Sequence, residues 1–183
     1  MSSTKILFLD LDECLLSSLY ANNDKHASDM LYTYGEYWPG VKYQLPGDGW
    51  YTSFIRSWSR ELIKHFQTTL GWCNVYILSW GSLDYVLRST HLLEMGVPHT
   101  NIYAREDMHD INPRFENMNM VLVDNENYDY HRSGIINKVK FLHGLNKHKL
   151  IQVPNFDVRY FRDDDDITID KMIDNIEETF NYE

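Results

Sequence analysis

The sequence predicts an α/β fold in which a central parallel sheet lies between two layers of helices. Short continuous apolar runs alternate with longer segments of helical periodicity, and several of the runs end in polar residues. A continuous apolar run is typical of a strand buried on both faces, as the strands of parallel sheets are. Because the two kinds of segment alternate as in βαβ units, we expect a Rossmann-like three-layer sandwich.

The predicted strands are short. The first is Lys5–Leu9, and those that follow share its apolar composition: Val75–Leu78, Asn101–Ala104, Met120–Val123 and Leu150–Val153. Apolar residues at helical spacing predict the following helices: Ser53–Leu70, Ser82–Met95, His131–His143 and Thr168–Phe180. The sequence contains no internal repeat and no low-complexity linker, so we expect a single domain over residues 1–183.

Residues 17–52 interrupt this alternation directly after the first predicted strand. The segment is rich in Tyr, Gly, Asn and Asp and contains Pro39-Gly40 and Pro46-Gly47, which predicts turns and a hairpin. An insertion there would hang over the carboxyl end of the sheet, where ligands bind in this fold class. We therefore interpret it as a lid or substrate flap, or else as an inert elaboration. Its aromatic residues would either grip a substrate or form a small core beneath the loops: Tyr32, Tyr34, Tyr37, Trp38, Trp50 and Tyr51.

Composition and charge restrict the class of protein. Hydrophobic residues make up 43% of the chain and the net charge is −10, so a folded core is expected and long nucleic acids are unlikely partners. The acidic run Asp163–Asp166 is expected to be a solvated loop. Cys14 and Cys73 form no CxxC pair and are expected to be reduced thiols. No signal peptide precedes the apolar run at Ile6, and no apolar stretch reaches the ~20 residues of a membrane span, so we expect a cytoplasmic protein with no membrane partner.

Two carboxylates, Asp10 and Asp12, directly follow the first predicted strand. Residues two apart on a strand point the same way, but a turn after Asp10 would make the pair bracket a small site at the strand tip. A divalent cation is a natural partner for such a pair, because Mg²⁺ takes oxygen ligands. Taken alone, the pair also describes a strand end with solvated acids.

Two further strand ends carry polar residues. Ser79-Trp80-Gly81 follows one predicted strand and precedes a helix, which offers a hydroxyl and free backbone N–H groups to an anion, or else simply caps the helix. Asp124-Asn125 follows another predicted strand and brings a further acid to the same edge of the sheet. Three such ends together favour a functional site over three separate caps.

These motifs together resemble the haloacid dehalogenase (HAD) superfamily of phosphatases, and within it the C-terminal-domain phosphatase branch. The first motif of that branch reads Asp-Leu-Asp-Glu-Thr-Leu, and its fourth often reads Asp-Asn. The segment Ile102–Glu106 also looks like the strand-then-Arg-Glu segment of the branch. The resemblance covers roughly residues 5–180 with the motifs in the expected order, and it implies a HAD-like core with the small insertion in place of a large cap domain.

The resemblance implies a role for each acid. Asp10 would be the nucleophile that forms an aspartyl-phosphate, and Asp12 would protonate the leaving oxygen and then activate water. Mg²⁺ would be held by the Asp10 carboxylate, the Asp12 backbone carbonyl and Asp124, with Asn125 supporting it directly or through water. The phosphoryl oxygens would be held by Ser79 and the backbone N–H groups near Trp80 and Gly81.

The sequence departs from the family pattern at two points. Cys14 stands where the family usually has Thr. The family's third motif is a Lys that neutralises the nucleophile and the phosphate, yet no Lys occurs between Lys64 and Lys138, the region where it is expected. The candidate replacements, in order of preference, are Arg114, Arg105 and His109.

Three functional hypotheses follow. The first is a Mg²⁺-dependent phosphomonoesterase whose substrate is a phosphoprotein, a nucleotide or the phosphorylated end of a nucleic acid. The second is a binding protein that keeps the fold and has weak or no catalysis, which the absent third-motif Lys favours. The third, a receiver domain like those of response regulators, fits less well, because there the acid pair follows the first strand while the phosphorylated Asp lies on a later one.

Overall fold

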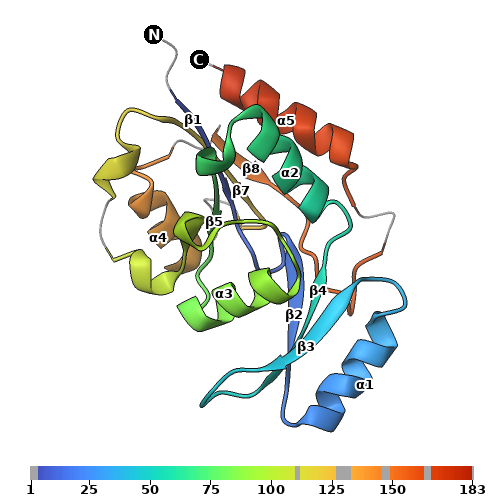
Figure 1. The fold of residues 1–183 in the computed structure, drawn as a ribbon. Helices are drawn as coiled ribbons and strands as arrows, with labels where there is room; N and C mark the ends of the chain where they lie inside the picture. Colours follow the sequence, from blue (N-terminus) through green and yellow to red (C-terminus); the bar gives the residue numbers. More distant parts are fainter. Residues whose placement is uncertain (1–3, 110–111, 127–132, 146–148, 163–165, 183) are drawn as a thin grey trace.

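The computed structural model describes residues 4–109, 112–126, 133–145, 149–162 and 166–182. Their centre is a five-stranded parallel sheet in the order β6-β5-β1-β7-β8 (Figure 1). Its strands are β1 (Lys5–Leu9), β5 (Val75–Leu78), β6 (Ile102–Tyr103), β7 (Asn119–Asp124) and β8 (Leu150–Gln152). All five correspond to the predicted apolar runs, and β1, β5 and β7 are buried almost throughout because helices cover both faces of the sheet.

Alternate residues of β1 point into two separate cores. Leu7 and Leu9 pack with the apolar stripes of α2 (Ser59–Thr69), α3 (Leu83–Leu92) and α5 (Ile169–Asn181). Ile6 and Phe8 pack on the other face with α4 (Ser133–Phe141) and the short helix η4 (Pro113–Phe115). The remaining short helices are η1 (Trp72–Asn74), η2 (His99–Asn101) and η3 (Arg105–Asp107). The predicted three-layer α/β architecture is therefore confirmed.

The strand order also decides between two fold families. Counted along the chain, the parallel strands lie in the order 3-2-1-4-5, with β1 at the centre. Receiver domains have the flavodoxin-like order 2-1-3-4-5. The receiver hypothesis is therefore wrong, because its topology differs from that of this sheet.

The segment after β1 forms a second, antiparallel sheet in the order β2-β4-β3. It comprises β2 (Leu16–Ala21), β3 (Gly40–Gln44) and β4 (Trp50–Ile55), with helix α1 (Asp24–Tyr34) against it. We call β2, α1, β3 and β4 the inserted sheet; in Figure 1 it extends below the main sheet. The segment contains more regular structure than the predicted turns and hairpin. Its helix α1 is capped by the Asn23 side chain, which accepts a hydrogen bond from the His26 N–H at 2.8 Å.

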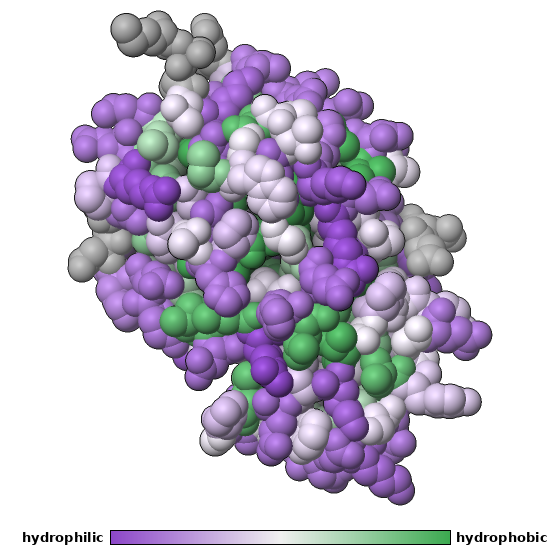
Figure 2. All heavy atoms as spheres, in the orientation of Figure 1, coloured by the Kyte–Doolittle hydropathy of each residue, from purple (hydrophilic) through white to green (hydrophobic). Residues whose placement is uncertain are grey.

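The aromatic residues of this segment divide between packing and exposure. Tyr34 and Trp38 pack against a small core of Leu19, Phe54 and neighbouring aromatic residues, which was the structural interpretation of them. Tyr32 and Tyr37 are exposed. Tyr51 packs against the main core and Trp50 is half-buried. The face in Figure 2 is largely hydrophilic, with apolar residues gathered across its middle.

The helix predicted over Ser53–Leu70 begins later than expected, at Ser59. Phe54 and Trp58 are four residues apart, which fits a helix, but the backbone of Phe54 pairs with both neighbouring strands of the inserted sheet. Two apolar residues four apart share a face both in a strand and in a helix. The apolar pattern alone therefore did not show where the strand ends and the helix begins. The residues His131 and Arg132 of another predicted helix lie outside the described part of the chain.

Buried Arg56 joins three distant segments just after β4. Its Nη1 donates to the carbonyl oxygens of Cys14 and Pro154, each at 3.0 Å, and its Nε donates to Asp166 Oδ1 at 3.0 Å. Trp58 Nε1 also donates to Asp166 Oδ1, at 3.0 Å. Asp166 is thus a structural ion-pair partner and not a solvated acid, which corrects the expectation for this residue of the acidic run; residues 163–165 lie outside the described segments.

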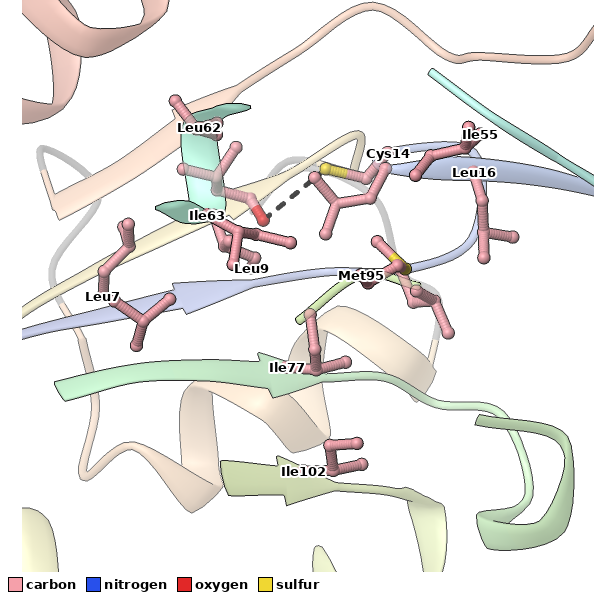
Figure 3. Close-up of a cluster of buried hydrophobic side chains, with 14 of the residues drawn as sticks. Leu7, Leu9, Cys14, Leu16, Ile55, Leu62, Ile63, Ile77, Met95 and Ile102 are labelled. Carbon is pink, nitrogen blue, oxygen red and sulfur yellow. Dashed lines mark hydrogen bonds between the residues drawn. The ribbon is translucent and has the colours of Figure 1, made fainter. Parts of the chain in front are cut away.

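Cys14 lies in the main core among the residues drawn in Figure 3. Its thiol donates to the Val123 carbonyl at 3.9 Å, and burial raises its pKa well above the usual value, so it stays a neutral thiol. Both cysteines are free, as expected. Among the described helices, none has the length and apolar character that a bilayer crossing requires.

We predict that Arg56→Met lowers the free energy of unfolding by about 3 kcal/mol, because it leaves buried carbonyl oxygens and Asp166 without their cation. Urea denaturation followed by circular dichroism measures the change. Arg159→Met is the matched control: Arg159 pairs with Asp157 at the surface, so its loss is expected to cost less than about 1 kcal/mol. Equal losses for the two variants would contradict this role of Arg56.

Candidate active site

The predicted site residues meet at the carboxyl edge of the parallel sheet. Asp10 follows β1, Ser79 follows β5, and Asp124 ends β7. The Asp10 N–H donates to the Val123 carbonyl at 2.9 Å, which keeps Asp10 beside β7. The side chains are buried, with Asp10 4% exposed and Asp124 and Ser79 fully buried. Adjacent parallel strands end at the same edge, so the fold itself brings these residues together.

A turn after Asp10 separates the two acids of the first motif, which is the second of the two arrangements considered from the sequence. Leu11 points into the core, and Glu13 adopts a left-handed conformation with φ 57°. Hydrogen bonds hold the turn: the Glu13 N–H donates to the Leu16 carbonyl at 2.7 Å, and the Glu13 carbonyl accepts from the Phe156 N–H at 2.7 Å. The Asp12 carboxyl is thereby directed to the side of the site formed by Ser79 and Tyr85.

Lys138 of α4 lies between the two buried acids. Its Nζ is 2.6 Å from Asp10 Oδ1 and 2.7 Å from Asp124 Oδ2. Burial alone would lower the pKa of Lys138, but the charges of Asp10 and Asp124 outweigh it and raise that pKa above its usual value, so Lys138 carries a positive charge. The pKa of Asp10 is raised well above its usual value by burial and by the charge of Asp124, while Lys138 opposes the rise.

The second oxygen of each carboxylate faces Asn125. The Asn125 amide turns its NH₂ group toward the acids, because its oxygen would face only acceptor oxygens there. The NH₂ group donates to Asp10 Oδ2 at 3.1 Å, to the Asp12 carbonyl oxygen at 3.2 Å and to Asp124 Oδ1 at 3.3 Å. The amide oxygen then lies on the side of Asn155.

This oxygen cluster has the donor chemistry of a hard divalent cation. Asp10 Oδ2, Asp124 Oδ1 and the Asp12 carbonyl oxygen all lie within hydrogen-bond distance of the Asn125 amide nitrogen, and oxygens of this kind are the ligands that Mg²⁺ takes. Among the described residues, no three His, Cys, Asp or Glu side chains are arranged to hold a metal ion. A cation here would therefore use the two carboxylates of Asp10 and Asp124 with the Asp12 carbonyl oxygen, and the Asn125 amide would turn to present its oxygen.

Ser79 and the start of α3 form the opposite wall. Ser79 Oγ accepts from the Gly81 N–H at 3.1 Å and lies 3.4 Å from Asp12 Oδ2. A Cβ on Gly81 would lie 2.7 Å from Tyr85 Cδ1, so only glycine fits there. Between these walls is a cavity of about 530 Å³, large enough for a phosphoryl group with part of its substrate. Its lining residues are Asp10, Asp12, Glu13, Trp80, Gly81, Asn125, Glu126, Gly134 and Lys138.

The proposed replacements for the third-motif Lys lie elsewhere. The Arg114 guanidinium is over the rings of Tyr76 and Phe115, and its Nη1 donates to the Tyr103 hydroxyl at 3.5 Å. Arg105 is half exposed and lines a smaller cavity beside Asp12. His109 is exposed. The expectation that Arg114 neutralises the nucleophile is therefore wrong, because Lys138 already contacts both acids.

Comparisons with known proteins give matches only at the level of structure. No family model matches the sequence, and no curated protein matches it. A variant of the fission yeast RNA polymerase II C-terminal-domain (CTD) phosphatase Fcp1, solved with beryllium fluoride, is similar over 82% of this chain with a TM-score of 0.54 and 12% identity. A structure of Fcp1, described as an essential RNA polymerase II CTD phosphatase, is similar over 95% of this chain with a TM-score of 0.57 and 12% identity. The chain has the Fcp1 fold.

This similarity confirms the predicted HAD-like fold and, at 12% identity, concerns the fold alone. The chain covers 41% and 48% of the two Fcp1 chains, so it spans less than half of either.

Lys138 is the functional candidate that could not be recognised from the motif order in the sequence. The candidates Arg114, Arg105 and His109 all precede Asp124 in the chain, whereas Lys138 lies 14 residues after it. One signal was available: Lys138 follows Ile135 by three residues and precedes Leu142 by four, so it stands in the apolar stripe of a helix. A lysine on the buried face of a helix needs a negatively charged partner. Asp10 and Asp124, at the ends of predicted strands, needed a positively charged one.

We predict that Lys138→Met lowers the free energy of unfolding at pH 7 by about 3 kcal/mol, because Asp10 and Asp124 are left buried and repelling each other. Chemical denaturation without divalent cations measures it. Lys140→Met, which changes an exposed lysine of the same helix, is the control and is expected to have little effect. Adding Asp124→Asn to Lys138→Met is expected to restore part of the loss; no recovery would contradict the electrostatic cause.

Proposed function

We propose that this chain is a Mg²⁺-dependent phosphomonoesterase that works through an aspartyl-phosphate on Asp10. The observation that carries the proposal is the shared contact of Lys138 with Asp10 and Asp124 at the floor of the cavity. This lysine supplies the positive charge that an incoming phosphoryl group requires next to a carboxylate nucleophile. The Fcp1 fold is consistent with this chemistry.

The proposed reaction has two steps. A carboxylate oxygen of Asp10 attacks phosphorus, the bond from phosphorus to the ester oxygen breaks, and that oxygen takes a proton from Asp12. Asp12, now a carboxylate, takes a proton from water as the water oxygen attacks phosphorus. The bond between phosphorus and Asp10 breaks, inorganic phosphate leaves, and both acids return to their starting states.

The other residues of the site would bind the phosphoryl group and neutralise its negative charge. Ser79 Oγ and the backbone N–H groups near Trp80 and Gly81 would hold phosphoryl oxygens at the start of α3. Mg²⁺ would be held by Asp10, the Asp12 carbonyl oxygen, Asp124 and Asn125, and when bound it would supply additional positive charge beside the phosphoryl oxygens. The convergence of Asp10 Oδ2, Asp124 Oδ1 and the Asp12 carbonyl oxygen on the Asn125 amide supports this set.

The open cavity and the charge of the chain suggest the substrate class. We propose a phosphoprotein, a nucleotide or a nucleic-acid end, since no large cap domain occurs in the described residues between β1 and β5. A net charge of −10 argues against long nucleic acids. Two free cysteines, and apolar runs shorter than a membrane span, are the sequence features behind the proposal of a cytoplasmic protein with no membrane partner. The alternative of an inactive binding protein rested on a missing lysine, and Lys138 removes that reason.

We predict that the wild type hydrolyses p-nitrophenyl phosphate only with Mg²⁺ and that Asp10→Asn abolishes turnover, because the amide is not a nucleophile. Release of p-nitrophenol measures the rate. Asp29→Asn, on the exposed face of α1, is the control and is expected to keep full activity. An Asp10→Asn variant as active as the wild type would exclude the proposed mechanism.

We predict that Mg²⁺ raises the melting temperature of the wild type and not that of Asp124→Asn, because a ligand that binds only the folded state stabilises it by RT ln(1 + [L]/Kd). Differential scanning fluorimetry with EDTA and with increasing MgCl₂ measures both. Asp84→Asn, an exposed acid of α3, is the control and is expected to respond as the wild type does. An equal response from Asp124→Asn would place the cation elsewhere.

A further inference from the structure

A chain of hydroxyl groups leads from the inserted sheet to the Asp12 carboxyl. Tyr43 Oη lies 2.9 Å from Ser53 Oγ, and Ser53 Oγ lies 2.5 Å from Ser18 Oγ. Ser18 Oγ is 2.7 Å from Tyr85 Oη, and the Tyr85 hydroxyl donates to Asp12 Oδ1. Four hydroxyls from four different elements therefore end on a single carboxylate oxygen.

The register of the inserted sheet builds this chain. Ser18 of β2 stands directly opposite Ser53 of β4. Tyr43 of β3 stands opposite Tyr51, so Ser53 lies two residues further along β4 on the same face. The face that carries these hydroxyls is turned toward α3, where Tyr85 completes the chain. A one-residue shift of either strand pair would remove the hydroxyls from this face.

Packing fixes the Tyr85 ring. Gly81 leaves no room between its backbone and the ring, since a Cβ there would lie 2.7 Å from Tyr85 Cδ1. The ring centroid of Tyr51 lies 5.6 Å from that of Tyr85 and 5.9 Å from that of Tyr43. Tyr43 and Tyr85 are both buried, and a buried hydroxyl without a partner is unfavourable, so the chain of contacts is strongly preferred.

We propose that Tyr85 is a positioning residue for Asp12, and that the inserted sheet holds it in place through Ser18. The two oxygens of the Asp12 carboxyl differ in their surroundings. Oδ1 is occupied by the Tyr85 hydroxyl, whereas Oδ2 lies on the Ser79 side of the site, 3.4 Å from Ser79 Oγ. Oδ2 is thus the oxygen that exchanges a proton with the leaving group. This role rests on the proposed phosphatase function.

The energetic reason is orientational. The torsion that turns a carboxyl group is broad, so without a fixed partner the Asp12 carboxyl would sample many orientations. Proton transfer requires Asp12 Oδ2 within hydrogen-bond reach of the leaving oxygen, and a misplacement of about 1 Å can cost about 100-fold in rate. On this view the inserted sheet takes part in leaving-group protonation as well as in any contact with the substrate.

The decisive experiment compares two leaving groups with Tyr85→Phe, which keeps the ring and removes the hydroxyl. The ratio kcat/KM reports the steps up to departure of the leaving group. Phenyl phosphate needs protonation of its leaving oxygen, and 2,4-dinitrophenyl phosphate does not. We expect Tyr85→Phe to lower kcat/KM about 10- to 100-fold for phenyl phosphate and by less than about 3-fold for 2,4-dinitrophenyl phosphate.

A second arm tests whether Tyr85 acts through Asp12. In an Asp12→Asn background, Tyr85→Phe is expected to cause no further loss on phenyl phosphate, because no acid remains to be positioned. Ser18→Ala is expected to give a smaller loss with the same dependence on the leaving group. Tyr20→Phe, which removes an exposed hydroxyl from the same strand as Ser18, is the matched control and is expected to behave as the wild type.

The outcomes separate the two levels of the proposal. A wild type that hydrolyses neither substrate would refute the proposed function and this role with it. An active wild type whose Tyr85→Phe variant loses equally on both substrates, or whose loss multiplies with that of Asp12→Asn, would refute the positioning role alone. Melting temperatures of all variants establish that each is folded under the assay conditions.

Discussion

The site depends on one buried contact, in which Lys138 neutralises Asp10 and Asp124 together. Two carboxylates at neighbouring strand ends repel each other in a medium that solvates charge poorly, and burial raises the pKa of Asp10 for the same reason. The lysine lets both acids remain close, and it occupies one oxygen of each. The other oxygen of each acid faces Asn125, and that of Asp124 also accepts from the Glu126 N–H at 2.8 Å. The cavity beside these acids and the group of oxygens around Asn125 both depend on this arrangement.

Much of the fold was predictable because its signals are local. Each strand of the parallel sheet is a short apolar run, and the prediction of a parallel sheet between helices followed from the alternation of these runs with helical segments. The limits of local signals appear at Phe54, whose spacing from Trp58 fits a helix although its backbone pairs within a sheet. The inserted sheet was underestimated for a similar reason: its strands are held by pairing across turns, and α1 buries little apolar surface.

The site was predictable in part. Residues that follow directly after a strand share an edge by topology alone, so Asp10, Ser79 and Asp124 could be placed together from the sequence. Lys138 could not be placed by that rule, because it reaches the edge from the middle of a helix. Tyr85 and Ser18 were not singled out either, since their contact with Asp12 depends on strand register and on a close approach at Gly81.

The position of Lys138 within the chain has a consequence for how such proteins are recognised. Its ammonium group reaches Asp10 and Asp124 from α4, downstream of the strand that carries Asp124, and a comparison based on the linear order of motifs would score the third-motif Lys as absent. A screen of that kind would class this chain among pseudoenzymes. A comparison of distances between side chains, made without regard to chain order, would detect the contacts of Lys138 with both acids.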